Sequence, residues 1–366
     1  MLIRQEGQNK KSSIVTLKPA DPIRKAMESI TRQGRITTVI VVNDDQKVIG
    51  TVTDGDIRRG LLKDFTISDT VDKIMNKNPI VVPSSMPKKN VLSLMRVNAI
   101  FHIPVVDDDG RLVGVEERVD DHLASAQEMT AVIMAGGEGQ RLRPLTETVP
   151  KPMLKVCGKP ILEILINCLK ECGFQKVIIN LGYLGHVIED YFKDGGKFGM
   201  KIEYVREPER LGTAGALGLM SESMLPKEAF LVINGDLLTN LNFRMFREFH
   251  INGDYIFTMC GRPHKVKIPY GYPVVDGDLV KDLQEKPSFT YLVNSGIYCL
   301  SPQLLEYVPK NKFFNMTELI ERCLKEDKRV GLFPLGEKFH EIGQMQSYQE
   351  ADAFYKEVFV KGREAA

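Results

Sequence analysis

The chain has 366 residues, 43% of them hydrophobic, which is enough for two or three domains with sizeable cores. The formal net charge of +1 leaves no global field to recruit nucleic acid or an anionic membrane surface, and no apolar run approaches the roughly 18 residues of a membrane span. The first residues are too polar for a signal-peptide core, and the six cysteines form no C-x-x-C motif, so the composition predicts a cytoplasmic protein.

An internal repeat comes first along the chain. Residues 37–57 align with residues 99–120, Gly50 matches Gly114, and each copy has two short β-branched runs around an Asp-rich turn. This pattern predicts a β-hairpin in each copy, and the amphipathic segments IRKAMESITRQ and KKNVLSLMRVN predict a helix before each hairpin. Because neither copy can bury its apolar face alone, we expect the two copies to pack together.

The repeat resembles a pair of CBS domains through the pattern G-x-x-T-x-x-D, formed by Gly50, Thr53 and Asp56. In such pairs the aspartate typically binds the ribose of an adenosine ligand and the threonine binds a phosphate. The second copy has Asp120 in the aspartate position but Glu117 in the threonine position, where a carboxylate repels phosphate. The resemblance implies a regulatory site for an adenine or guanine nucleotide at Thr53, Asp56 and Asp120. The alternative is a scaffold that only dimerises the protein.

From residue 130 onward, strand-like and helix-like segments alternate. TAVIMAG, KVIINLG, KIEYVRE and AFLVING read as strands, and LEILINCLKECG, HVIEDYFKDG and AGALGLMSESM read as the helices between them. This alternation predicts a doubly wound α/β sheet. Residues 254–298 are richer in strands and predict a mixed subdomain over one end of the sheet, and MTELIERCLKED and SYQEADAFYKEVF predict terminal helices.

A glycine-rich loop follows the first of these strands. Glycine at positions 136, 137 and 139 lets backbone N–H groups approach a phosphate closely, and Arg141 and Lys151 follow. The loop lacks the G-K-[ST] of a P-loop, and Arg141 stands where a dinucleotide fingerprint needs glycine. Ligands of open α/β sheets bind beyond the carboxyl ends of the strands, so the loop predicts a phosphate site there. A plain turn is the alternative.

The region from 130 to 355 resembles the nucleotidyltransferase family that activates sugar 1-phosphates. The family's fingerprint G-G-x-G-x-R-L, P-L-T and P-K-P stands at residues 136–142, 144–146 and 150–152, and the blocks LGTAGAL, NGD, PYG, EKP and NSGIY follow in order. The resemblance implies a GT-A-like domain with a doubly wound mixed sheet and Mg²⁺ as the cofactor. It also implies a reaction in which a sugar 1-phosphate attacks the α-phosphorus of a nucleoside triphosphate and pyrophosphate leaves.

The same resemblance implies roles for individual residues. Arg141 and Lys151 hold the triphosphate and stabilise the leaving pyrophosphate, Asp236 holds Mg²⁺, Lys286 meets the sugar phosphate, and Glu285 accepts hydrogen bonds from sugar hydroxyls. Further expected contacts are Gly271 and Asn294 to the sugar, and Gly136, Gly137, Gly139, Glu207, Gly212 and Thr213 to the nucleotide. The alternatives are solvated surface charges and, for Asp236, a helix cap.

The second metal ligand departs from the family pattern. The family commonly carries D-I-G near its end, whereas this chain has Glu341, Ile342 and Gly343, with Gln344 in place of the usual threonine. A glutamate is one methylene longer than an aspartate and can still coordinate, so Glu341 is the predicted second ligand. Loss of that ligand is the alternative.

The base is predicted to be read at Glu207, where relatives that use uridine or thymidine triphosphates often have glutamine. A carboxylate only accepts hydrogen bonds, and guanine offers two adjacent donors, N1–H and the N2 amine. The block around Gly212 and Thr213 also looks like that of guanylyltransferases. We therefore favour GTP, with UTP, CTP or dTTP as alternatives and a plain salt bridge as the other role for Glu207.

The predicted architecture is a tandem CBS (α+β) pair at residues 1–65 and 66–125, followed by a nucleotidyltransferase domain at 129–360. This fusion resembles the glucosamine-1-phosphate guanylyltransferases of legionaminic acid pathways, which implies glucosamine 1-phosphate as substrate and a homodimer or higher homo-oligomer. Mannose, heptose and glucose 1-phosphates are alternatives. A nucleotide-sensing regulatory protein with an inactive transferase domain is the alternative from another class, and only Glu341 favours it.

Overall fold

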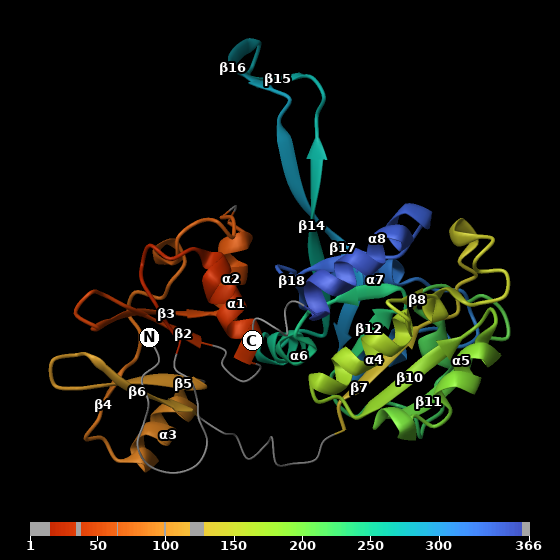
Figure 1. Ribbon diagram of the computed structural model, residues 1–366, viewed down its shortest axis with the longest axis horizontal. Coiled ribbons are helices and arrows are strands. Elements are labelled where there is room, and N and C mark those ends of the chain that lie inside the picture. The colour runs from red at the N-terminus through yellow and green to blue at the C-terminus, as the bar shows by residue number, and fades with distance from the viewer. Residues whose placement is uncertain (1–14, 34–37, 64, 99, 118–127, 361–366) are drawn as a thin grey trace. The chain divides into compact units, whose positions relative to one another are not determined.

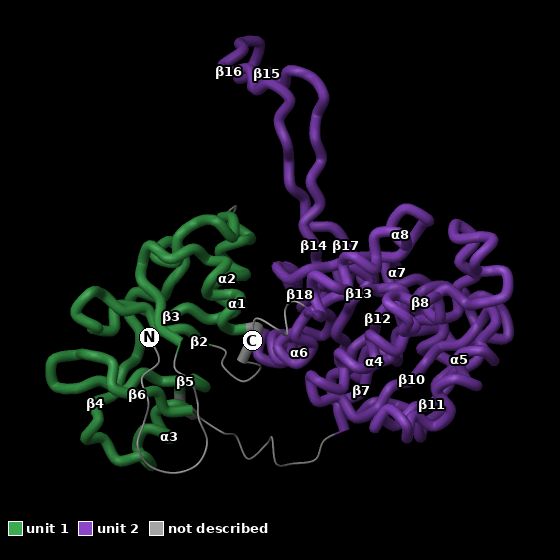
Figure 2. Tube along the Cα trace, in the orientation of Figure 1, with its two compact units in different colours: residues 1–127 green, residues 128–366 purple. Residues whose placement is uncertain are grey.

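The computed structural model describes residues 15–33, 38–63, 65–98, 100–117 and 128–360. The chain divides into two compact units, residues 1–127 and residues 128–366 (Figure 2). Among the described residues, no helix is both long enough and apolar enough to cross a membrane.

The first unit contains the repeat as two matching three-stranded sheets, in the orders β1-β2-β3 and β4-β5-β6. In each sheet the first pair of strands is parallel and the second pair is an antiparallel hairpin. The two hairpins have a bulge at the same relative place, between Val41 and Val42 and between Val105 and Val106, which confirms the repeat in the strand register. The elements of this unit are β1 (Thr16–Leu17), α1 (Ile23–Gln33), β2 (Thr38–Val42), β3 (Val48–Thr53), α2 (Asp54–Leu61), β4 (Val82–Pro83), α3 (Lys88–Val97), β5 (His102–Val106) and β6 (Leu112–Glu117).

The two copies pack against each other, as the sequence predicts. Ile40 and Val42 of the first copy share a buried cluster with Leu112 of the second. The Leu112 N–H also donates to the Gln46 carbonyl oxygen at 3.0 Å, so the two hairpin turns are hydrogen-bonded to each other.

The second unit is built on a seven-stranded mixed sheet in the order β11-β10-β7-β12-β17-β14-β18 (Figure 1). Strands β11, β10, β7 and β12 run parallel, β17 is antiparallel to both of its neighbours, and β14 and β18 are parallel. The strands are β7 (Thr130–Met134), β10 (Lys176–Leu181), β11 (Lys201–Arg206), β12 (Phe230–Asn234), β14 (Phe257–Lys267), β17 (Ser288–Leu300) and β18 (Val330–Pro334).

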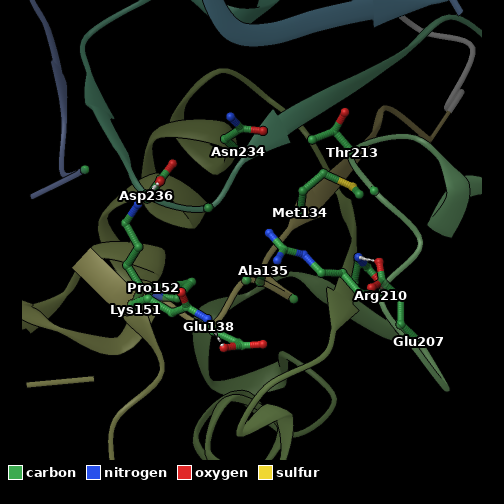
Figure 3. Close-up of a pocket in the computed structure, with 18 of the residues that line it drawn as sticks. Met134, Ala135, Glu138, Lys151, Pro152, Glu207, Arg210, Thr213, Asn234 and Asp236 are labelled. Carbon is green, nitrogen blue, oxygen red and sulfur yellow. Dashed lines mark hydrogen bonds and ion pairs between the residues drawn. The ribbon is translucent and has the colours of Figure 1, made fainter. Parts of the chain in front are cut away.

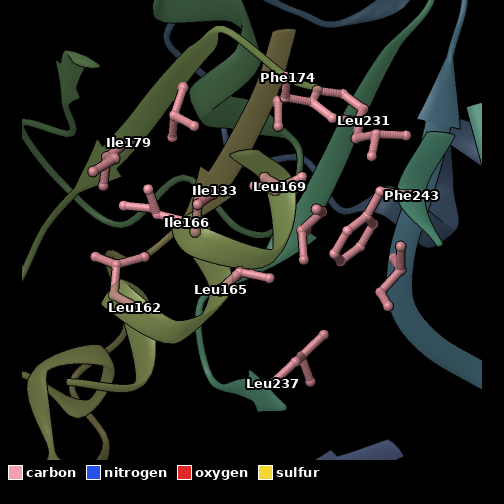
Figure 4. Packing of buried hydrophobic residues seen from close by; sticks show 14 of the residues in the cluster. Ile133, Leu162, Leu165, Ile166, Leu169, Phe174, Ile179, Leu231, Leu237 and Phe243 are labelled. Atoms are coloured by element: carbon pink, nitrogen blue, oxygen red, sulfur yellow. The ribbon is translucent and has the colours of Figure 1, made fainter. Parts of the chain in front are cut away.

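Helices cover both faces of this sheet, which is the predicted doubly wound arrangement. Ala131 and Ile133 of β7 belong to one buried cluster and Val132 to another, because successive side chains of a strand point to opposite faces. The first cluster includes residues of α4 (Ile161–Glu171), α5 (Gly185–Phe192) and α6 (Phe243–Asn252), and the second includes residues of α7 (Met316–Lys325). Figure 4 shows the side chains at positions 162, 165, 166 and 169 of α4 packed in the first cluster. These positions have the spacing of an apolar helix face.

One predicted helix is much shorter than expected. The segment AGALGLMSESM forms only a 3₁₀ helix, Gly215–Leu219. Its two glycines weaken an α-helix, and a side chain at Gly215 would lie 2.7 Å from the Lys312 carbonyl oxygen. Close packing of the backbone against residues 312–314 is therefore favoured over a regular helix.

The strand-rich region also differs from expectation. Instead of a subdomain over one end of the sheet, β14 and β17 are strands of the sheet itself and continue beyond it as a two-stranded ribbon. The ribbon ends in the hairpin of β15 (Gly271–Asp276) and β16 (Leu279–Glu285). Residues 262–293, called the arm below, stand away from the rest of the second unit (Figure 1). Short alternating runs predict strands, but they do not tell where a strand leaves its sheet.

Candidate active site

A cavity of about 770 Å³ opens at the carboxyl edge of the parallel strands in the second unit. It is bounded by Met134 at the end of β7, Asn180 near the end of β10 and Asn234 at the end of β12. This is the edge at which open α/β sheets bind their ligands. The predicted site residues that line it are Gly136, Gly137, Gly139, Arg141, Lys151, Glu207, Gly212, Thr213 and Asp236.

The glycine loop forms one wall of the cavity. Gly139 has a φ of +63°, and a Cβ there would lie 3.0 Å from Thr146 and 3.1 Å from Lys151, so other residues are strained at this position. The Thr146 hydroxyl donates to the Gly139 carbonyl oxygen at 2.8 Å and fixes the turn. Gly137, in contrast, has open space where a Cβ would be, so its backbone is accessible to a ligand in the cavity.

Lys151 and Asp236 form an ion pair inside the cavity, and Figure 3 shows their side chains meeting. The Lys151 ammonium donates to Oδ2 of Asp236, and both side chains are largely buried. Oδ1 of Asp236 is buried without a hydrogen-bond partner. The helix-cap alternative is wrong for Asp236, because the strand β13 (Leu237–Thr239) follows it directly.

The unpaired oxygen of Asp236 fits a metal ligand. Within the described residues no three His, Cys, Asp or Glu side chains are grouped closely enough to hold a metal alone. Mg²⁺ does not need such a group, because it is usually held by one or two carboxylates, water and the phosphates of its substrate. A lone carboxylate oxygen beside a phosphate-sized cavity is therefore compatible with this ion.

Glu341 lies on the strand next to Asp236 but does not line the cavity. It belongs to β19 (Phe339–Glu341), which pairs with β13 so that Leu237 faces Glu341. The Ile342 N–H donates to the Asp236 carbonyl oxygen at 3.0 Å. The Glu341 side chain is 44% exposed, and its carboxylate is 3.9 Å from the Arg262 guanidinium. Its role as the second metal ligand stays a prediction.

Glu207 is held at the opposite side of the cavity by Asn180. The Asn180 amide donates to Oε1 of Glu207 at 2.6 Å, and the Leu211 N–H is 3.4 Å from Oε2. In the described part of the chain the Glu207 carboxylate makes no ion pair, which argues against the salt-bridge alternative. Asn180 is only 2% exposed, and its carbonyl oxygen is a buried acceptor without a partner.

Asn180 and several other lining residues are absent from the predicted set. Asn180 is a polar residue near the end of an otherwise apolar strand, and that was its only signal in the sequence. Phe313 and Asn315 come from a segment a hundred residues beyond the base loop, and Gly212 and Thr213 contact Phe314 and Asn315 of this segment. The Thr213 hydroxyl accepts from the Met316 N–H at 2.8 Å. The others are Met134, Ala135, Glu138, Gln140, Pro152, Arg210, Asn234, Gly235 and Gly343.

The predicted sugar-binding residues are not at this cavity. Gly271 and Glu285 face each other in the hairpin at the end of the arm, and Lys286 follows in a left-handed backbone conformation with a φ of 47°. Asn294 lies where the arm leaves the sheet, and its amide donates to the Tyr298 hydroxyl at 2.8 Å. None of these four residues is among those lining the cavity of their own chain, so their contact with sugar stays a prediction.

In the first unit, Thr53 and Asp56 form the N-terminal cap of α2. The Thr53 N–H and hydroxyl both donate to Oδ2 of Asp56, at 2.8 Å and 2.7 Å, and Arg59 pairs with Oδ1 at 2.5 Å. Both residues therefore have structural partners already. Asp120, the third predicted residue of the regulatory site, lies outside the described residues.

Two family models match the chain. One, described as nucleotidyl transferase, matches residues 130–358, and one, described as CBS domain, matches residues 11–63 and 71–115. The N-acetylmuramate alpha-1-phosphate uridylyltransferase of Neisseria meningitidis is 45% identical over 62% of this chain and 97% of its own length. The mannose-1-phosphate guanylyltransferase catalytic subunit beta of Danio rerio is 35% identical over 49% of this chain and 52% of its own length.

A solved structure is also similar. The crystal structure of HddC from Yersinia pseudotuberculosis aligns with a TM-score of 0.50 and 29% identity, over 62% of this chain and 100% of that one. The chain spans less than two thirds of the length of several curated relatives, including the Danio rerio protein. The matched region is the second unit, which holds the cavity.

Proposed function

Because the chain belongs to the nucleotidyl transferase family and carries a tandem CBS pair, we propose that it is a cytoplasmic enzyme that transfers a guanylyl group from GTP to glucosamine 1-phosphate. An oxygen of the sugar phosphate forms a bond to the α-phosphorus, the bond from that phosphorus to the β-phosphate bridge breaks, and pyrophosphate leaves. Its curated relatives are named as sugar-1-phosphate transferases for uridylyl or guanylyl groups. UTP, CTP or dTTP with another hexose or heptose 1-phosphate is the alternative substrate pair.

The observation that carries the proposal is the arrangement of opposite charges around the cavity. The glycine loop, Arg141 and Lys151 offer backbone and cationic donors, and Asp236 offers an unpaired carboxylate oxygen beside them. Phosphoryl chemistry needs little covalent help from a protein, but it needs positioning and neutralisation of charge on the phosphates. Arg141 and Lys151 would bind the triphosphate, and they act most strongly as negative charge grows on the departing pyrophosphate.

Asp236 is the residue we assign to hold Mg²⁺, with Glu341 as the second ligand. When bound, the ion neutralises phosphate charge and orients the triphosphate. The contribution of the chain is to hold the Asp236 carboxylate in place, through Lys151 on one oxygen and through strand β13.

GTP is favoured by the chemistry at Glu207 and Asn180. Both side chains line the cavity, and the Oε2 atom of Glu207 has only a 3.4 Å contact with the Leu211 N–H. The two oxygens of the Glu207 carboxylate complement the adjacent N1–H and N2 amine of guanine, and the hydrogen bond from the Asn180 amide orients them. Uracil and thymine present one donor between two acceptors and complement this pair less well.

Glu207→Gln is expected to lower the preference for GTP over UTP by about 10- to 100-fold, since one charge-assisted hydrogen bond is worth roughly 1.5–3 kcal/mol. The variant keeps the size of the side chain and an oxygen for the Asn180 amide. The measurement is kcat/KM for each triphosphate at fixed sugar 1-phosphate. Glu209→Gln is the matched control, because Glu209 is exposed and does not line the cavity. Unchanged selectivity in Glu207→Gln would contradict the assignment of the base.

For the CBS pair we propose a regulatory adenine or guanine nucleotide site that includes Thr53 and Asp56, and Asp120 in the second copy. A ligand regulates only if it binds two arrangements of the protein with different affinities. The alternative is that Thr53 and Asp56 serve only to cap α2. Removing such a cap costs about 1 kcal/mol of stability. The chain offers a matched control, because Thr66 and Asp69 make the same pair of hydrogen bonds.

Asp56→Ala is expected to weaken the binding of AMP, ADP or ATP to the full-length protein by about 10-fold or more, the value of a charge-assisted hydrogen bond. Calorimetry measures this affinity. The same titration with the Asp236→Asn variant distinguishes binding at the CBS site from binding in the cavity. Asp69→Ala should lose the same two hydrogen bonds, there within a turn, and keep the affinity. Equal losses of nucleotide affinity in the two variants would mean that Asp56 contributes to stability alone. No heat of nucleotide binding with the wild-type protein would favour the alternative of a scaffold that only dimerises the protein.

Release of pyrophosphate that depends on the sugar 1-phosphate tests the proposed function directly. We expect the full-length protein to release pyrophosphate from GTP with Mg²⁺ only when glucosamine 1-phosphate is present. Absence of release with every triphosphate and every sugar 1-phosphate of a panel would instead favour the regulatory protein with an inactive transferase domain.

A further inference from the structure

The arm has no core of its own. It is a ribbon of two strands, and none of the residues from 262 to 293 is buried. Large apolar side chains on it are nevertheless exposed, including Tyr270 at 74%, Leu279 at 65% and Leu283 at 65%. The others are Val266, Tyr272, Val275, Val280 and Tyr291. Isolated two-stranded hairpins are marginally stable in water, and contiguous exposed apolar surface usually marks a binding site.

No residue of the arm lines the cavity of its own chain. Its strands continue the ladder of the main sheet without a break after the bulge at Met259 and Gly261, up to the pair of Lys267 and Ser288. Six residues beyond Gly261 extend the ribbon by about 20 Å, at about 3.3 Å per residue, and the β15–β16 hairpin continues outward from there. The end of the arm therefore stands away from the sheet of its own chain (Figure 1).

The lining of the cavity does not include Glu285 and Lys286, the side chains that the proposed function assigns to the sugar 1-phosphate. Its cationic side chains are Arg141, Lys151 and Arg210, all on the glycine loop side or the base loop. Phe313, which is 59% exposed, also lines the cavity. The arm carries what is missing, an apolar surface together with His264, Lys265, Lys267 and Lys286.

We propose that two copies of this chain exchange arms, so that the arm of one copy closes the cavity of the other and brings Glu285 and Lys286 to the sugar phosphate there. This inference rests on the proposed function for the roles of these two residues. A reciprocal exchange about a twofold axis completes two cavities and covers the apolar surface of two arms at once. Lys286 has a left-handed backbone and lies outside both ladders, between the pairs Gly271–Glu285 and Lys267–Ser288, and its side chain is 58% exposed.

Complementation between two damaged chains separates exchange from action within one chain. Asp236→Asn and Lys286→Ala chains with different tags are co-expressed, and the mixed dimer is purified through both tags. At sugar 1-phosphate concentrations well below the KM, each parent is expected to lose about 10-fold or more in kcat/KM, the value of one charge-assisted contact. With arm exchange, one of the two sites in the mixed dimer carries both changes and the other carries neither, so about half of the wild-type rate returns.

If Lys286 acts within its own chain, every site of the mixed dimer has one defect and the rate stays at that of the parents. That result, with both parents impaired, overturns the exchange and leaves the proposed function intact. A Lys286→Ala chain with wild-type kcat/KM would remove Lys286 from the site and would overturn both the assigned role and the exchange.

A second measurement does not depend on activity. A photoreactive benzoylphenylalanine in place of Tyr270 is irradiated in the full-length protein, prepared from a mixture of ¹⁴N- and ¹⁵N-labelled chains. We expect a covalent dimer in which the peptide at 270 is joined to residues 136–152 or 313–315 of a chain carrying the other label. Cross-links confined to a single chain, or between two arms only, would overturn the exchange even if the enzyme is inactive under the conditions chosen.

Discussion

Asp236→Asn is expected to lower turnover by about 100-fold or more while leaving the fold intact, because several kcal/mol of charge stabilisation come from the metal that this carboxylate holds. Asparagine keeps the shape of the side chain, and its oxygen is a poorer ligand for Mg²⁺. The carboxylate oxygen without a protein partner, Oδ1, is the atom whose charge is removed. The measurement is kcat at saturating GTP and sugar 1-phosphate over a range of Mg²⁺ concentrations.

The control for this prediction is Asp190→Asn, which removes the charge of an exposed carboxylate on α5 that is paired with Lys193. It should leave kcat and its dependence on Mg²⁺ at wild-type values. Near-wild-type, Mg²⁺-dependent turnover in Asp236→Asn would contradict the assigned metal site, and it would leave the lone oxygen of Asp236 without an explanation.

Lys151→Ala and Arg141→Ala are each expected to lower kcat by about 10²- to 10³-fold, the range for losing one preorganised donor to developing negative charge. The loss in Lys151→Ala has a second part, because the Asp236 carboxylate then faces the triphosphate without its cation. The effects of Lys151→Ala and Asp236→Asn on kcat should therefore not be additive. In the double variant of Lys151→Ala with Asp236→Asn, the loss in kcat should be smaller than the product of the two single losses.

Lys155→Ala is the matched control for the cation, since Lys155 is exposed on the neighbouring strand β8 (Lys155–Val156) and does not line the cavity. Wild-type kcat in this control, with the expected loss in Lys151→Ala, separates a specific role from a general loss of positive charge. A fully additive double variant would show that Lys151 and Asp236 act independently, and it would contradict the coupling inferred from their contact.

The fold of the second unit could be predicted in outline because its signals are local. The apolar positions 162, 165, 166 and 169 repeat with helical spacing, and these side chains form the buried face of α4. The glycine loop could be predicted for the same reason, since the conformation of Gly139 and its closeness to Thr146 are requirements of one short segment. Asp236 comes two residues after the end of β12, and the carboxyl edge of a sheet is where such a residue meets ligands.

The parts that could not be predicted depend on contacts between distant segments. Asn180 and Phe313 reach the cavity only through the packing of the sheet and of the 311–316 loop, and no motif marks either residue. The arm is the largest case. The alternating runs that form β14 and β17 predict strands, but the same alternation continues where the strands leave the sheet, so the place of Glu285 and Lys286 could not be read from it.

A single competition reaction tests the central claim most directly. The full-length protein is given Mg²⁺, glucosamine 1-phosphate, and equal concentrations of GTP, UTP, CTP and dTTP, and the nucleotide sugars formed are identified by mass. We predict that the guanosine diphosphate derivative of glucosamine is the main product, with pyrophosphate released in equal amount. A uridine, cytidine or thymidine product as the main species would contradict the reading of the base at Glu207, and no nucleotide sugar from this or any other sugar 1-phosphate would contradict the proposed activity itself.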